Sequence, residues 1–416
     1  MPAREPVRPL ELIGLGLFAL ALRLAMVWAI PAAGGRPYRN CAPDEPAHFA
    51  IVRALASGRA PTWPDETSSI YGAFLPTPYF AQALSLAVAG DLPATERTAS
   101  SHPAAREYGA ARLGSALLGA LAVVALAAAA GILACQRGAT LSVGLAAACY
   151  PQLVLLGAYV NADAFTLCAG AFYALALARW ARRGEGEEGL KALGAAGGVV
   201  ALGQLSGYYL VPATVPWLAW ALWRGRMRAR ALVGPLLAFL LVLGPFLVWN
   251  VRRNGGDALG LGRYHRFLLA VRDGPHIRAP ERFSAFLASF GKFTDLPLGW
   301  PFYLFAALFL ASGLSMAVAA LRHASGTARR AAFFLGTAVL ANLALTVNLY
   351  SFVDFSPSGG SLLLSAIFLT GVAVAVPRNV LSARLGLAFT VAYLLFLFAA
   401  AVEAQVLVDP HPCLPG

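Results

Sequence analysis

The sequence predicts an all-α, polytopic transmembrane protein with about eleven membrane-spanning helices. Three observations predict this fold class. Of the 416 residues, 59% are hydrophobic and only 12% are charged, which leaves too little polar surface for a soluble domain of this size. Apolar stretches of about 20 residues, enough to cross a bilayer as a helix, recur along the chain. Short segments that carry arginine separate many of these stretches.

The predicted spans follow one another from the N-terminus to the C-terminus. They cover approximately residues 10–31, 109–134, 139–160, 164–181, 190–205, 208–223, 231–249, 300–321, 331–349, 361–377 and 385–404. The fifth and sixth stretches can also be read as one broken helix. The first is expected to be a span and not a cleaved signal peptide, because it contains Arg23 and Arg36-Pro37-Tyr38-Arg39 follows it in place of a small-residue cleavage site. Residues 1–416 are expected to form a single transmembrane domain.

Basic residues concentrate in alternate loops of this arrangement. Arg4 and Arg8 precede the first span, and the loop at 224–230 contains four arginines. By the positive-inside rule these loops and the N-terminus face the cytoplasm. The same asymmetry accounts for the net charge of +12, so that charge gives no evidence of nucleic-acid binding. The expected location is a bacterial-type inner (plasma) membrane, crossed many times.

Two segments on the opposite side, about 32–108 and about 250–299, are too long to be simple connections. The first should contain two short interfacial helices. One covers residues 46–57, with Pro46 at its start and Gly58 at its end. The other covers about 78–90. The alternative that 78–90 is a twelfth span would reverse the topology of everything after it, and the arginine asymmetry argues against that.

Asp44, Glu45 and His48 form the sharpest group of candidate functional residues. At a helix start, His48 lies one turn beyond both carboxylates, so all three side chains can converge. The helix dipole alone also favours carboxylates at this position. Their predicted place just outside the bilayer favours a functional site.

The segment Pro43-Asp44-Glu45-Pro46-Ala47-His48-Phe49 resembles the first outer loop of the GT-C superfamily. These are integral membrane glycosyltransferases that use polyprenyl-phosphate sugars, and the protein mannosyltransferases and aminoarabinose transferases among them place an Asp-Glu pair in this loop. Further segments of this chain resemble family elements in the same order: residues 76–80, 110–115, 150–163, 249–257 and 289–300. The resemblance therefore extends over most of the chain.

The resemblance implies a glycosyltransferase that moves a sugar from a polyprenyl-phosphate donor to an outward-facing cell-envelope acceptor, which is a lipid, a glycan or a protein. It also implies that Asp44 is the general base that deprotonates the acceptor hydroxyl. Stabilisation of the departing phosphate is needed as well. Arg252 and Arg253, which Asn254 follows, lie just beyond the seventh span, at a suitable depth for a phosphate. Interfacial anchoring is the alternative role of these arginines.

Four more residues are candidates for substrate binding. Arg23 lies inside the first span, where a charge is costly, so it is expected to reach a phosphate or a carboxylate, or else to snorkel. Asn161 and Asp163 lie at the outer mouth of the third and fourth spans, where a capped turn is the alternative. Tyr79 is expected to line a sugar or lipid groove, or to belong to an aromatic belt.

This chain also departs from the family pattern. Leu202-Gly203-Gln204 stands where relatives have Leu-Thr-Lys, and Ser358-Gly359-Gly360-Ser361 stands where they carry Gly-Arg-Tyr. Two groups that could contact a phosphate are thus missing, which keeps open an inactive relative that serves as a partner subunit. A transporter or lipid flippase is another alternative, although the acidic residues avoid the span centres and no internal repeat is visible.

The cofactor and the cysteines complete the sequence-based expectations. No cofactor is indicated with certainty, but a divalent metal ion that bridges Asp44 or Glu45 to the donor phosphate remains open. Cys41 and Cys413 are the only outward-facing cysteines of the predicted topology, so a disulfide between them is expected. The other cysteines lie in or beside spans, as small packing residues do.

Overall fold

The structure is a computed structural model that describes residues 8–29, 45–61, 72, 74–89, 105–134, 137–149, 151–203, 210–260 and 262. Within these residues the chain is helical and has no strand. The predicted spans after residue 262, the candidate base Asp44 and the departure at Gln204 lie outside the described residues, as do Cys41 and Cys413.

Four helices of the described part are long and apolar enough to cross a membrane, which makes the chain a multi-pass membrane protein. They are α1 (Pro9–Ala29), α4 (Ala105–Ala134), α7 (Asp163–Arg182) and α10 (Val233–Arg253), the last of which follows the 3-10 helix η4 (Ala229–Leu232). These helices lie where the sequence predicts spans. The total of eleven stays a prediction, because the last four predicted spans lie beyond the described residues.

The helix predicted over residues 139–160 is instead divided in two. The structure has α5 (Arg137–Cys149) and α6 (Pro151–Leu156), after which the chain turns at residues 157–161. The division falls at Pro151, which has no N–H for the helical hydrogen bond and disfavours helical backbone in the residue before it.

The fifth and sixth predicted spans correspond to two short helices, α8 (Leu190–Ala201) and α9 (Leu210–Trp223). Their 12 and 14 residues give lengths of about 18 and 21 Å, below the roughly 30 Å of a bilayer core. Residues 204–209 between them lie outside the described part, so the broken-helix alternative stays open.

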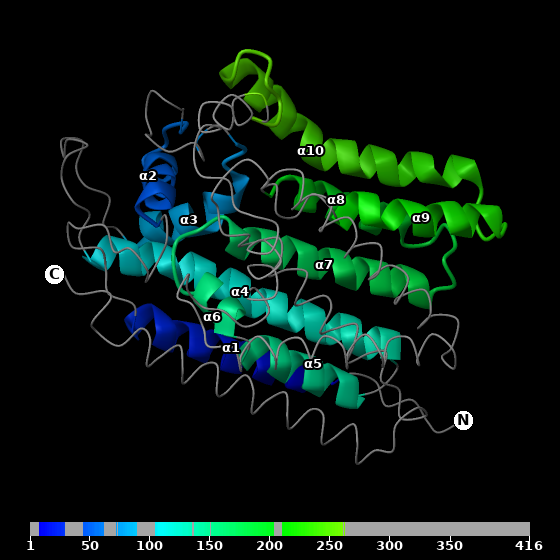
Figure 1. The fold of residues 1–416 in the computed structure, drawn as a ribbon, viewed down its shortest axis with the longest axis horizontal. Coiled ribbons are helices and arrows are strands. Elements are labelled where there is room, and N and C mark those ends of the chain that lie inside the picture. The colour runs from blue at the N-terminus through cyan, green and yellow to red at the C-terminus, as the bar shows by residue number, and fades with distance from the viewer. Residues whose placement is uncertain are drawn as a thin grey trace, which may run out of the picture.

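The helices of the bundle pack side by side in the order α10, α8, α7, α4, α1, with α5 against α1 and α4 (Figure 1). Small residues allow these backbones to approach closely. At the α8–α10 crossing, a Cβ on Gly194 would lie 2.6 Å from the Cα atom of Pro235. α1 and α10 expose large apolar side chains, among them Leu17, Trp28 and Leu241, as helices in contact with lipid do.

Helix α4 is longer than a bilayer core is thick. The helix has 30 residues and is therefore about 45 Å long. Two short helices pack near its first turns: α2 (Glu45–Ala56) and α3 (Phe80–Val88), the latter preceded by the 3-10 helix η2 (Thr77–Tyr79). Both helices occur where the sequence predicts them. The nine residues of α3 span only about 14 Å, which does not fit the alternative of a twelfth span.

Helix α2 ends and packs in ways that explain its sequence. Gly58 closes it, as predicted, in a left-handed conformation with φ 71°, and the N–H of Arg59 donates to the carbonyl of Ala54 at 2.9 Å. Its apolar side faces protein, because Phe49 and Val52 are buried with α3 and α4. The packing therefore fixes α2 on the end of α4.

Candidate active site

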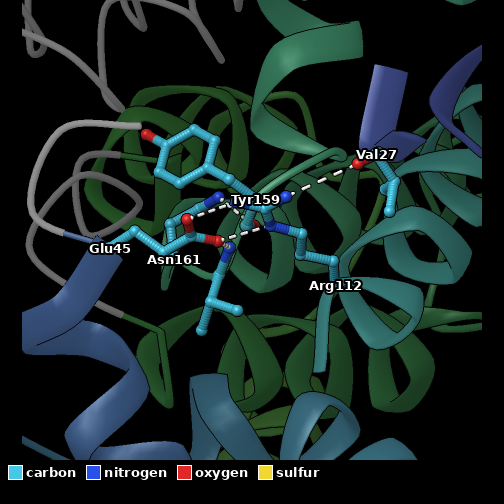
Figure 2. Close-up of polar contacts among 6 residues, drawn as sticks. Val27, Glu45, Arg112, Tyr159 and Asn161 are labelled. Atoms are coloured by element: carbon cyan, nitrogen blue, oxygen red, sulfur yellow. Dashed lines mark hydrogen bonds and ion pairs between the residues drawn. The ribbon is translucent and has the colours of Figure 1, made fainter. Parts of the chain in front are cut away.

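The first turn of α2 is joined to α4 by a buried ion pair (Figure 2). Nε and Nη2 of Arg112 donate to the two carboxylate oxygens of Glu45 at 2.8 and 2.7 Å. The backbone N–H of Val160 also donates to Oε1 of Glu45, at 2.9 Å. Each charged side chain is only 2% exposed. We call Glu45, Arg112 and the Val160 N–H the carboxylate clamp.

The clamp connects three segments that are far apart in the sequence. Glu45 belongs to α2, Arg112 to α4 and Val160 to the turn before α7. A fourth contact reaches α1, because Nη1 of Arg112 lies 3.4 Å from the carbonyl oxygen of Val27. A two-pronged Arg–carboxylate contact fixes orientation as well as distance. The clamp therefore fixes the position of residue 45, which directly follows Asp44.

Glu45 is poorly suited to act as a base or a metal ligand. Both of its oxygens accept hydrogen bonds from Arg112, whose positive charge offsets that of the carboxylate. Binding of a metal ion would require this pair to separate. Among the described residues, no three His, Cys, Asp or Glu side chains come together in an arrangement that could hold a metal ion. The bridging metal ion stays a prediction.

His48 lies one turn further along α2 and contacts Tyr79. The Tyr79 hydroxyl is 2.6 Å from Nδ1 of His48, and Tyr79 is fully buried. Burial lowers the pKa of His48 from 6.5 to about 3, so its imidazole is neutral at physiological pH. The structure thus places Tyr79 in the packing between α2 and α3.

Gln82 and Asn161 extend the polar network beneath α3. Nε2 of Gln82 donates to the Ser115 hydroxyl at 3.0 Å and to the Asn161 carbonyl at 2.7 Å. The Asn161 side chain donates to two carbonyls of its own turn and accepts from the N–H of Ala164 at 2.8 Å. This is the capped turn that the sequence offered as the alternative to substrate binding at Asn161. Asp163, the first residue of α7, is partly buried beside it.

Arg253 connects the end of α10 to the first outer segment. Its guanidinium donates to the carbonyls of Pro61, Gly72 and Phe74 at 2.6, 2.9 and 2.8 Å. It also lies over the ring of Trp249, 4.6 Å from the ring centroid. A phosphate would have to compete with these three carbonyls for the same N–H groups.

The two neighbours of Arg253 differ from it. Arg252 is exposed at the end of α10, which leaves its guanidinium accessible to an anion. Asn254 is buried, and its amide donates to Oδ1 of Asn250 at 3.0 Å. Of the three residues predicted to bind substrate here, the structure leaves Arg252 the most accessible.

Arg23 is fully buried in α1, one turn deeper than Val27. The stem of its side chain fits between Gly119 and Gly157. A Cβ added to Gly119 would lie 2.5 Å from Nε of Arg23, and one added to Gly157 would lie 2.7 Å from Cδ of Arg23. Nη1 donates to the Ala19 carbonyl at 2.9 Å. Nε and Nη2 have no hydrogen-bond partner among the described residues. The predicted contact of Arg23 with a phosphate or a carboxylate stays a prediction.

Most of the predicted site residues meet at one end of the helical bundle. Glu45, His48, Tyr79 and Asn161 lie around the first turns of α4, and Arg253 attaches the end of α10 to the same region. The sequence reasoning did not single out Arg112 or Gln82 as site residues. An arginine in an apolar stretch was the available signal for Arg112, whereas no comparable signal existed for Gln82.

Comparisons with known proteins bear on the family and the fold of the chain. Residues 106–249 match the model of the dolichyl-phosphate-mannose-protein mannosyltransferase family. That stretch includes Arg112 of the clamp. The comparison with curated proteins found no significant match.

Several solved structures are similar in fold. ArnT from Cupriavidus metallidurans bound to undecaprenyl phosphate is 19% identical with a TM-score of 0.55, and the match covers 96% of this chain and 64% of ArnT. Its apo state gives the same identity and TM-score, with coverages of 97% and 65%. The apo Archaeoglobus fulgidus oligosaccharyltransferase is 15% identical with a TM-score of 0.47, and the match covers 97% of this chain and 56% of that protein. The chain thus spans less than two thirds of the length of each of these proteins.

The fold first defines a class, that of multi-pass helical membrane proteins built like ArnT. Within this class, the match to the mannosyltransferase family and the likeness to ArnT confirm the resemblance to the GT-C glycosyltransferases that the sequence predicts.

Proposed function

We propose that this chain is an integral membrane glycosyltransferase that transfers a sugar from a polyprenyl phosphate to an outward-facing envelope acceptor. The observation that carries the proposal is the carboxylate clamp, which fixes the residue next to Asp44 at the end of α4. The likeness in fold to ArnT, solved with undecaprenyl phosphate, supports the class of donor.

The clamp also supports a division of roles between the two acidic residues. Glu45 pairs with Arg112 and positions the start of α2, whereas Asp44 serves as the general base. Asp44 takes the proton from the acceptor hydroxyl while that oxygen bonds to the anomeric carbon of the sugar. The bond from that carbon to the phosphate oxygen breaks, and the polyprenyl phosphate leaves with the bonding electron pair.

The departing phosphate requires a cation at the same level of the membrane. Arg252 is the candidate for this contact, because it is exposed at the end of α10. Arg253 acts indirectly, since its hydrogen bonds attach the first outer segment to α10. In this proposal the clamp end of the bundle faces outward from an inner membrane, and the N-terminus is cytoplasmic.

The proposal is tested by incubating the purified protein with radiolabelled polyprenyl-phosphate sugars and cell-envelope acceptors. We expect labelled product together with free polyprenyl phosphate for at least one donor–acceptor pair. Absence of transfer with every donor would contradict the proposal. The inactive-subunit alternative would then take its place, since Gln204 and the region of Gly360 lack the cations found in relatives.

A further inference from the structure

The turn between α9 and α10 carries four arginines within seven residues, at 224, 226, 228 and 230. It lies at the opposite end of the bundle from α2 and α3 (Figure 1). Arg226 pairs with the buried carboxylate of Glu185. Arg224, Arg228 and Arg230 are exposed, and none of them pairs with an acidic side chain within the part of the chain that the structure describes.

The backbone of this turn is well defined. Gly225 adopts φ 67°, and the N–H of Arg226 donates to the carbonyl of Ala221 at 3.0 Å, which closes α9. Met227 is only 5% exposed and packs in the main hydrophobic core. Met227 thus anchors the turn to the core, while Arg224, Arg228 and Arg230 around it are exposed.

Tryptophans accompany the arginines on this surface. The Trp223 side chain is 78% exposed. The Arg224 guanidinium lies 5.2 Å from the Trp223 ring centroid and 5.7 Å from that of Trp220. Exposed tryptophan at the end of a membrane helix is typical of the head-group level of a bilayer. The same surface therefore offers an interfacial ring and unpaired positive charge.

The loop between α7 and α8 lies at the same end of the bundle but has a different charge balance. Besides Glu185, whose carboxylate pairs with Arg226, it contains Glu187 and Glu188 beside its arginines, and Arg183 pairs with Glu188 at 2.9 Å. Of these two described segments, the α9–α10 turn therefore has the larger excess of positive charge.

We propose that Trp223, Arg224, Arg228 and Arg230 form a binding surface for anionic phospholipid head groups, which we call the arginine turn. Guanidinium groups donate to phosphate oxygens, and basic clusters beside a membrane helix attract anionic lipids. Each arginine near an anionic leaflet should raise lipid binding roughly fivefold, which corresponds to an attraction of about 1 kcal/mol per basic residue. The surface is separate from the carboxylate clamp, so this proposal does not depend on the proposed enzymatic function.

The test measures lipid binding by native mass spectrometry. The intact protein in detergent is equilibrated with an equimolar mixture of phosphatidylglycerol and phosphatidylcholine, and the ratio of the two bound lipids is recorded. We expect wild type to prefer phosphatidylglycerol. In the variant R224Q/R228Q/R230Q the ratio of bound phosphatidylglycerol to bound phosphatidylcholine should be lower by at least about tenfold. Added salt should reduce the wild-type preference, because exposed charges are screened.

A matched variant, R179Q/R182Q/R183Q, removes three arginines from the neighbouring segment at the same end. We expect its lipid preference to change less than about twofold, because Glu187 and Glu188 offset much of the charge of these arginines. Both variants must show the wild-type unfolding temperature in detergent, and single substitutions at 224, 228 and 230 replace the triple variant if it does not. An unchanged preference in R224Q/R228Q/R230Q, or equal losses in both variants, would overturn the proposal.

Discussion

Replacement of Arg112 by glutamine removes the positive charge from the carboxylate clamp and leaves the remainder of the fold in place. Arg112 supplies two of the three donors to the Glu45 carboxylate. After the substitution, only the N–H of Val160 among these donors still contacts Glu45. The carboxylate remains nearly fully buried. The variant therefore measures the cost of a buried charge that has lost its counter-ion.

The expected magnitude follows from this burial. Removal of one partner of a buried ion pair typically lowers the free energy of unfolding by about 3–5 kcal/mol. Glu45→Gln should have a similar effect, because it leaves the Arg112 guanidinium buried without a carboxylate. The double variant carries no charge at either position, so its loss should be smaller than the sum of the single losses by about 2 kcal/mol or more.

The assay is denaturant unfolding of the purified protein in detergent, followed by helical circular dichroism for wild type, both single variants and the double variant. The coupling free energy is obtained from the four values. An Arg112→Gln variant within about 0.5 kcal/mol of wild type, or strictly additive losses, would refute the role assigned to the clamp.

Three further predictions concern other contacts of the candidate site. A Cβ on Gly114 would lie 2.6 Å from the α3 backbone, so Gly114→Ala should lower the unfolding temperature. Gly109 has open space around the position of an added Cβ, so Gly109→Ala should leave the unfolding temperature unchanged or raise it. Burial lowers the pKa of His48 to about 3, so as the pH falls the unfolded chain binds a proton at this residue before the folded chain does. The free energy of unfolding should therefore drop by about 2 kcal/mol between pH 7 and pH 5. His48→Gln should remove this component of the pH dependence. Arg253→Ala should accelerate limited proteolysis of the first outer segment, whereas Arg252→Ala should not. Arg252→Ala should instead raise the KM for the donor. Faster proteolysis in Arg252→Ala together with a raised donor KM in Arg253→Ala alone would contradict these assignments.

The long helices of this fold were largely readable from the sequence. A chain inside a bilayer must satisfy its backbone hydrogen bonds internally, so a long apolar stretch there becomes a helix. The ranges predicted for α1, α4, α7 and α10 follow from this rule. The rule does not locate breaks, because Pro151 lies within an apolar stretch of sufficient length. The predicted helix therefore passed through a residue at which the structure divides it.

The candidate site was readable only in part. The run around Asp44 and Glu45 indicates a helix start near the membrane surface, since both features are local. The partner of Glu45 is Arg112, which is 67 residues away, and no local pattern identifies such a partner. The sequence shows that a charge in a span needs a counter-ion and does not show which one.

Arg253 is a second residue whose contacts could not be predicted from the local sequence. Its place after a predicted span suggested a phosphate contact, because arginine and phosphate are complementary in charge and shape. The structure directs its guanidinium to three backbone carbonyls. Since every residue offers a carbonyl, only the folded arrangement determines which ones an arginine reaches.

The most direct test of the proposed function is the turnover of Asp44→Asn relative to wild type, with a donor and an acceptor that the wild type uses. Asparagine preserves the size of the side chain but cannot accept the acceptor proton as a carboxylate does. We expect turnover to fall by about 10²–10⁴-fold while the unfolding temperature in detergent stays at the wild-type value. Near wild-type turnover in a folded Asp44→Asn variant would contradict the assignment of Asp44 as the general base.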